Sequence, residues 1–356
     1  MPGSKGKRKS NFIPVFFIIL GLLFLGFVIR TDYVLVKPGT AQDLREMVTV
    51  EEADRDDRGK FFLVTVAQQQ ASLWSLLYGY LHPYIEVQRL SNVIPPGMQE
   101  QEYHELLEQW MQESKNTAQV IALRRAGYNV EIISEGVVVA GFLENSPSRG
   151  ILSKGDLITA VDGENTLLAG EVISAVQQRQ VGDPVRLTVL RDSEKLELTV
   201  ITVPHPDDPK LPALGVFIST LSWEPVLPID VELATGEIAG PSAGLMFVLE
   251  ILNQLQPGDL TSGHLIAGTG TIDINENVGP IGGVFQKVIA AERAEASYFL
   301  VPVENYEEAK TAVHQIELIP VKTLQEALDF LDSLAAAGGS SFQLDHGHEG
   351  RFVPAA

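Results

Sequence analysis

A charge-free run from Phe12 to Ile29 is the feature that most constrains how this chain can fold. The run is eighteen residues long, with Lys9 before it and Arg30 after it. With a rise of about 1.5 Å per residue, a helix of this length just crosses a hydrocarbon core of roughly 30 Å. We therefore expect a transmembrane anchor over residues 11–30.

A cleaved signal peptide is the competing interpretation of this run. The apolar region of such a peptide is shorter, about 7–15 residues, and ends at a small-x-small cleavage site. The stretch FVIRTDYVLV that leaves the run contains no such site, which favours an uncleaved anchor. The basic residues ahead of the run are Lys5, Lys7, Arg8 and Lys9. Because positive flanks stay inside the cell, we expect residues 1–10 to be cytoplasmic and the body of this single-pass cell-membrane protein to be extracytoplasmic.

Overall composition excludes several classes of function. The chain has 26 basic and 46 acidic residues, a formal net charge of −20. Phosphate backbones repel so acidic a body, which argues against nucleic acid as a partner. Cysteine is absent, which excludes a thiol nucleophile and cysteine-ligated zinc. The two histidines of DHGHEG, near the end of the chain, are a weak metal motif, so we expect no metal and no cofactor.

Changes in patterning divide the body into segments. Residues 31–126 contain two runs of strand length and a helical pattern from Tyr103 to Ala126, and we interpret them as an accessory extracytoplasmic segment. Residues 127–204 are rich in strands and turns. A proline-rich acidic linker leads to residues 212–336, where strands and helices alternate as in an α/β or α+β domain. Residues 337–356 have the composition of a flexible tail.

The stretch SPSRGILSKGDLITAVDG, Ser146 to Gly163, resembles a PDZ domain of the bacterial type. A small β-rich domain without a ligand is the alternative. A PDZ domain adds an extended peptide to an open sheet edge, and backbone amides hold its terminal carboxylate. The resemblance implies polypeptide partners recognised by their C-termini. It also implies a carboxylate loop ahead of the first strand, formed by Gly127, Tyr128, Asn129 and Val130.

The stretch GPSAG, Gly240 to Gly244, has the form of a nucleophile turn with Ser242 at its centre. An α/β-hydrolase would need an aspartate and a histidine downstream. Only about 125 residues lie between the linker and the tail, which counts against that fold. A Ser–Lys dyad is the other candidate. Lys287 lies in an apolar helical stretch where burial would make it a neutral base, although a lysine that snorkels from a helix edge fits the pattern equally well.

The spacing of several motifs resembles the proteolytic domain of the Lon protease family. GPSAGL is followed, in order, by TGTIDINENVGPIGGVFQK, and the resemblance covers residues 212–336. It implies that Ser242 is the catalytic serine, Lys287 the catalytic lysine and Thr269 the threonine that orients them. Two departures stand out. Ala239 replaces the acidic residue usual before GPSAG, and the usual Lys-Glu pair is missing before Lys287.

The order of anchor, PDZ domain and Lon-type domain resembles that of the membrane-anchored Lon-like peptidases of Gram-positive bacteria. We therefore expect a multidomain protein of α/β and α+β class that acts as a serine endopeptidase on polypeptides presented by its PDZ domain. The sequence has no G-x-x-x-x-G-K-[ST] motif, so we expect the activity to be independent of ATP. Because Lon domains commonly form rings, we expect a homo-oligomer. The alternative is a catalytically silent, membrane-tethered PDZ scaffold that binds C-terminal tails and oligomerises.

Overall fold

The computed structural model describes residues 12–337, with gaps at 52, 54–57, 95–97, 144–145 and 206–208. The expected cytoplasmic N-terminus, residues 1–10, lies outside the described residues. So does the expected tail after Ala337, including its histidines.

Helix α1 (Phe12–Val28) covers most of the expected anchor and is 17 residues long. Among the residues that the structure describes, no helix is both long enough and apolar enough to cross a membrane. The transmembrane anchor therefore stays a prediction.

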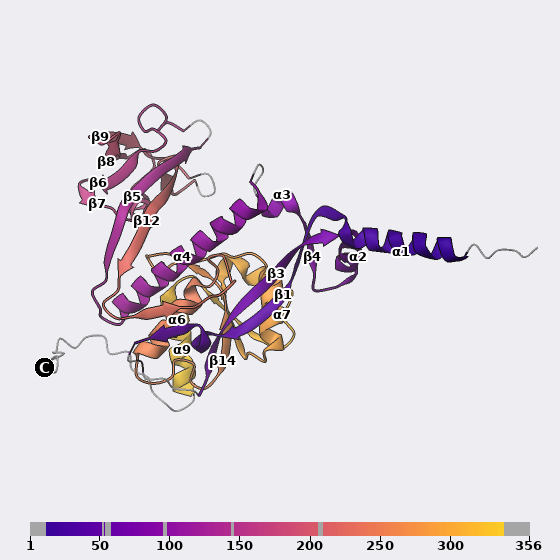
Figure 1. The fold of residues 1–356 in the computed structure, drawn as a ribbon. Coiled ribbons are helices and arrows are strands. Elements are labelled where there is room, and N and C mark those ends of the chain that lie inside the picture. Colours follow the sequence, from indigo (N-terminus) through magenta and orange to yellow (C-terminus); the bar gives the residue numbers. More distant parts are fainter. Residues whose placement is uncertain are drawn as a thin grey trace, which may run out of the picture.

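A six-stranded sheet forms the centre of the larger body (Figure 1). Its order is β18-β17-β14-β3-β1-β4, in which β18, β17, β14 and β3 run parallel while β1 is antiparallel to both of its neighbours. The strands are β1 (Arg30–Asp43), β3 (Lys60–Ser72), β4 (Glu86–Arg89), β14 (Leu265–Gly268), β17 (Tyr298–Pro302) and β18 (Glu317–Val321). The expected accessory segment, residues 31–126, thus supplies three strands to the same sheet as residues 212–336.

Helices cover both faces of this sheet, because the side chains of its strands alternate between two cores. Phe61 and Leu63 of β3 are buried in one core together with residues of α4, α6 and α9, whereas Val64 belongs to a second core with residues of α7. The helices are α4 (Glu100–Arg125), α6 (Gly244–Leu255), α7 (Val284–Arg293) and α9 (Leu324–Ala337). The helical pattern expected at residues 103–126 is therefore a structural helix that packs on α6.

Short elements complete this body. They are η1 (Leu44–Glu46), β2 (Val48–Val50), α2 (Leu73–Leu81), α3 (Leu90–Val93), β13 (Val231–Leu233), β15 (Thr271–Ile272), β16 (Val278–Gly279), η2 (Val303–Asn305) and α8 (Tyr306–Lys310).

A second sheet lies beyond the C-terminal end of α4 and forms a smaller body (Figure 1). Its order is β12-β5-β6-β8-β9, with β7 paired to β6, and helix α5 packs on it. The elements are β5 (Glu131–Phe142), β6 (Leu157–Val161), β7 (Glu164–Asn165), α5 (Ala169–Gln177), β8 (Pro184–Arg191), β9 (Glu194–Ile201) and β12 (Val216–Val226). Asp192 and Ser193, both at positive φ, form the two-residue turn that joins β8 to β9.

Strand β12 connects the two bodies. It pairs antiparallel with β5 along its whole length, from Val216 opposite Phe142 to Val226 opposite Glu131. The acidic linker expected between two domains joins β10 (Val203–Pro204) to β11 (Pro212–Ala213), which pair with each other. The strands on either side of the linker therefore pair with each other, and β12 leads from the smaller body into the larger one, where Trp223 is buried.

Candidate active site

Ser242 lies in the turn that leads into α6. Gly240 has a left-handed φ of 92°, a conformation that favours glycine. The Ser242 carbonyl accepts hydrogen bonds from the Gly270 amide (2.9 Å) and the Thr269 hydroxyl (3.0 Å). These bonds hold the turn against the segment that follows β14, while Ser242 itself is only half-buried. The serine is thus fixed in position and still reachable from solvent.

Lys287 projects from the first turn of α7 toward this serine. Its Nζ lies 2.7 Å from Ser242 Oγ, and the residue is 2% exposed. Gly283, which precedes the helix, has a φ of 68°, and a Cβ there would come within 2.9 Å of the Val66 side chain on β3. Glycine at this position therefore lets α7 begin close to the sheet, which brings Lys287 to the serine.

Thr269 links the two residues. It follows β14 directly and is fully buried, and its amide donates to the Leu300 carbonyl of β17 at 3.0 Å. Its hydroxyl accepts a hydrogen bond from Lys287 Nζ at 2.9 Å and donates to the Ser242 carbonyl. The structure thus brings together all three residues that the sequence singled out in residues 212–336.

Burial lowers the pKa of Lys287 from 10.5 to about 7. The physical cause is desolvation, because a buried ammonium loses its hydration and the neutral amine is favoured. Near neutral pH a large fraction of the lysine is therefore uncharged. An uncharged amine at 2.7 Å from a hydroxyl can accept its proton.

The residues described in the structure contain no group of three or more histidine, aspartate or glutamate side chains placed to hold a metal ion. The expectation that the protein needs no metal and no cofactor stays a prediction.

The residues expected to form the carboxylate loop of the PDZ domain form the C-terminal cap of α4 instead. Gly127 follows the end of α4 with a φ of 90°, and its amide donates to the Arg124 carbonyl. The Tyr128 amide donates to the Leu123 carbonyl, which completes a Schellman cap of the helix. Asn129 leads on to Val130, which is buried in the core of the larger body. The amides of Gly127 and Tyr128 are thus engaged in the helix cap and not free to hold a carboxylate.

Strand β12 is one of the two edge strands of the smaller sheet, β9 being the other, and its residues were predicted to belong to the following domain. Gly215, with a φ of 71°, stands directly before this strand. One sequence signal could have located this edge. It is the apolar run Leu214–Phe217, which contains a glycine and follows the linker, whereas residues 127–130 follow α4.

Two family models match the chain. A PDZ domain matches residues 112–202, and the Lon protease C-terminal proteolytic domain matches residues 228–332. The chain combines a PDZ domain with a Lon-type proteolytic domain. This confirms the coarse fold class expected from the sequence. Ser242, Thr269 and Lys287 all lie within the match to the Lon-type domain.

Known relatives resemble only part of the chain. Lon protease 2 of Bacillus subtilis is 38% identical over 92 residues, which are 26% of this chain and 16% of that protein. The Lon protease of Koribacter versatilis is 37% identical over 108 residues, which are 28% of this chain and 13% of that protein. The matched region is thus under a fifth of each relative. A PDZ domain of an SdrC-like protein from Listeria monocytogenes is 22% identical and covers 25% of this chain and 92% of its own, with a TM-score of 0.23.

Replacing Lys287 with methionine is expected to stabilise the Lon-type domain near neutral pH. The folded pKa is about 7 and the ordinary value is 10.5, so the unfolded chain binds more protons between these values. Wild-type stability therefore rises with pH across that window, and the cost of the buried lysine is greatest at or below pH 7. At about 1.4 kcal/mol per pKa unit, the methionine variant should have a free energy of unfolding a few kcal/mol higher than wild type at pH 7. The difference should be small near pH 10.5.

Thermal unfolding between pH 6.5 and 10.5 measures this difference. Lys310→Met is the matched control, because that lysine is exposed and pairs with Glu307 on α8. Equal pH dependence in wild type and Lys287→Met would contradict a depressed lysine pKa.

Proposed function

We propose that this protein is a serine endopeptidase that uses a dyad of Ser242 and Lys287. The observation that carries the proposal is the 2.7 Å approach of a buried lysine amine to the serine hydroxyl. Homology of the Lon-type domain to Lon proteases supports a serine protease. The absence of a G-x-x-x-x-G-K-[ST] motif from the sequence supports an activity without ATP hydrolysis by this chain.

The reaction follows from the geometry of the three residues. Neutral Lys287 removes the proton of Ser242 as Oγ attacks the carbonyl carbon of a peptide bond. The lysine, now charged, gives that proton to the leaving amine, and the acyl-enzyme remains on Ser242. Lys287 then takes a proton from a water molecule whose oxygen attacks the acyl carbonyl. The bond to Ser242 Oγ breaks, the second product leaves, and the lysine returns the proton to Oγ. Thr269 contacts both partners and keeps the amine directed at the serine.

The PDZ domain is proposed to recruit polypeptides for this reaction. Its edge strand β12 presents one row of backbone groups that no other described strand pairs, and such an edge accepts an extended peptide. The loop before β12, which contains Gly215, is our revised candidate for holding a substrate carboxylate. Recruitment raises the local concentration of the chain near Ser242. Assembly into a homo-oligomer stays a prediction.

Lys287→Arg is expected to be nearly as inactive as Lys287→Ala and Ser242→Ala, with a loss of at least about 1,000-fold in kcat. A guanidinium stays protonated at any working pH and cannot act as a base. Cleavage of an unfolded protein substrate by the purified chain measures this, with Lys310→Arg as the control substitution on the surface. Lys287→Arg activity within tenfold of wild type would remove the lysine from its proposed role.

We further propose that the protein is tethered to the cell membrane through α1 together with α2. The two helices lie side by side, and Trp74 of α2 donates its Nε1 hydrogen to the Leu23 carbonyl at 2.8 Å (Figure 1). Gly26 permits this approach, because a Cβ there would meet the indole at 2.1 Å. Six large residues of α2 are between 38% and 77% exposed: Leu73, Trp74, Leu77, Tyr78, Tyr80 and Leu81.

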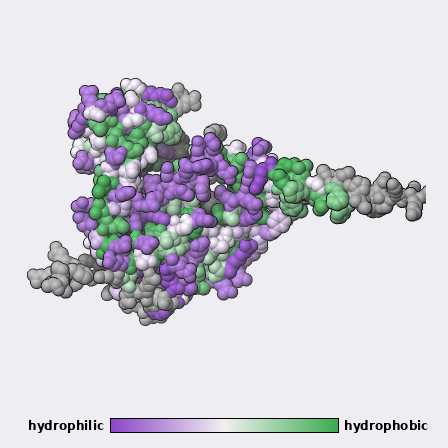
Figure 2. All heavy atoms as spheres, viewed as in Figure 1, coloured by the Kyte–Doolittle hydropathy of each residue, from purple (hydrophilic) through white to green (hydrophobic). Residues whose placement is uncertain are grey.

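Charge and side-chain type support this tether. Figure 2 shows one apolar patch where α1 and α2 leave the body. Tryptophan and tyrosine favour the boundary between lipid and water, and apolar helix faces can lie within it. The basic residues before α1 favour a cytoplasmic N-terminus and an extracytoplasmic body.

Trp74 is expected to contact lipid when the full chain is reconstituted in vesicles. Bromine on the acyl chains should then quench the fluorescence of a variant that keeps Trp74 but carries Trp110→Phe and Trp223→Phe. The matched control keeps only Trp110, which is 40% exposed against 38% for Trp74, and should not be quenched. Equal quenching of both variants, or none of Trp74, would contradict the tether.

A further inference from the structure

A cavity of about 350 Å³ lies where α4, the PDZ domain and the Lon-type domain meet. Each of the three parts contributes large apolar side chains to its wall. The residues that define its character are Trp110, Leu168, Trp223, Pro241, Ile272 and Ile274. None of these residues was predicted from the sequence to contact a substrate side chain.

The cavity adjoins the turn that carries Ser242, whereas Ser242, Thr269 and Lys287 are not among its lining residues. Pro241 directly precedes Ser242, and its carbonyl accepts a hydrogen bond from Ser114 of α4 at 3.2 Å. Ile272 lies two residues after Gly270, whose amide holds the Ser242 carbonyl. A residue of an extended chain spans about 3.3 Å. A substrate with its scissile carbonyl at Ser242 therefore has side chains within reach of the cavity a few residues away.

A groove between α4 and β12 leads to the same place. Its volume is about 730 Å³, and it shares Trp110, Glu113, Thr220 and Trp223 with the cavity. The Trp223 carbonyl accepts a hydrogen bond from Asn116 of α4 at 2.9 Å, so the outer edge of β12 faces this groove. An edge strand can pair with an extended peptide. The main chain of a substrate can therefore lie along Ser219 to Ser222 of β12, ahead of the carbonyl that Asn116 already occupies, while one side chain enters the cavity.

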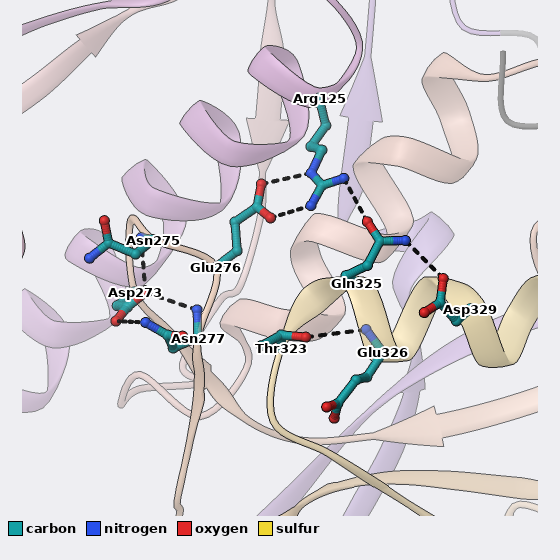
Figure 3. Close-up of polar contacts among 9 residues, drawn as sticks. All are labelled: Arg125, Asp273, Asn275, Glu276, Asn277, Thr323, Gln325, Glu326 and Asp329. Atoms are coloured by element: carbon teal, nitrogen blue, oxygen red, sulfur yellow. Dashed lines mark hydrogen bonds and ion pairs between the residues drawn. The ribbon is translucent and has the colours of Figure 1, made fainter. Parts of the chain in front are cut away.

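Polar contacts link the three parts, and Figure 3 shows those that join the turn between β15 and β16 to α4, and α4 to α9. They converge on the turn between β15 and β16, where Glu276 makes a two-point ion pair with Arg125 at the end of α4. Arg125 also donates to Gln325 of α9 at 3.0 Å. On the PDZ side, Asn275 donates to the Ser174 hydroxyl of α5 at 2.8 Å. These contacts tie the turn whose Asp273 and Ile274 line the cavity to α4 and to the PDZ domain.

We propose that this cavity is a specificity pocket for a large apolar side chain of the polypeptide substrate, close to the scissile bond. Its selectivity depends on α4 and on the PDZ domain as well as on the Lon-type domain. The two indoles and the aliphatic side chains of its wall suit phenylalanine, leucine or methionine. The inference rests on the proposed peptidase function, because it takes Ser242 as the point of attack.

Binding is the first test, and it uses the full-length chain with Ser242→Ala so that peptides are not cut. The probes are unstructured peptides that carry phenylalanine or alanine at a single varied position. At one position, phenylalanine should bind at least tenfold more tightly than alanine. Trp110→Ala should abolish that difference, and Ala169→Phe, which fills the cavity from the PDZ side, should favour alanine instead.

The control is Leu190→Ala, which removes an apolar side chain of equal exposure, 39% against 40% for Trp110, from a strand outside the cavity. It should leave the preference for phenylalanine intact. A preference that survives both Trp110→Ala and Ala169→Phe, or no preference at any position, would overturn the specificity pocket. The same peptides offered to the chain with Ser242 intact test cleavage separately. Selective binding without cleavage would contradict the proposed function and leave the pocket standing.

Discussion

The buried amine of Lys287 beside the hydroxyl of Ser242 is the interaction on which the rest of the structure depends. A charged ammonium in this position would lose its hydration, so burial favours the uncharged amine. The pKa of Lys287 is therefore lowered to about 7. Three separate segments must meet for this to happen: the turn before α6, the end of β14 and the first turn of α7. Each is tied to the others through Thr269, Gly270 and the main chain of Ser242.

The candidate dyad was predictable because its signals are local and stand in order along the chain. A small-residue turn before an apolar helix, a Thr-Gly pair and a glycine-rich approach to a lysine each describe a short piece of backbone. The pairing of β3 with β14 could not be predicted from the sequence. Residues 60–63 and 265–268 are about 200 positions apart, and a parallel pair between them has no motif in either stretch. Residues 31–126 were therefore predicted to be separate from residues 212–336, although they supply β3, one of the two central strands of the sheet.

The position of the PDZ edge was missed for a related physical reason. We expected the carboxylate loop before the first strand, at Gly127 to Val130, where the chain instead forms the cap of α4. The strand that lies beside β5 arrives after the linker, as β12. Only long-range pairing reveals this, and pairing also places the edge of the PDZ sheet next to α4. The turn from Asp273 to Asn277 contacts Ser174 of the PDZ domain and Arg125 of α4.

The central claim is that Lys287 activates Ser242 through its neutral form. The most direct measurement is the rate at which a serine-reactive fluorophosphonate labels the intact protein between pH 5.5 and 9, followed by mass. The account predicts a single adduct on Ser242, with a labelling rate that rises around a midpoint of about pH 7. In Lys287→Met this rise should disappear and labelling should be slow at every pH. Labelling of Ser242 at the same rate with and without Lys287 would contradict the account.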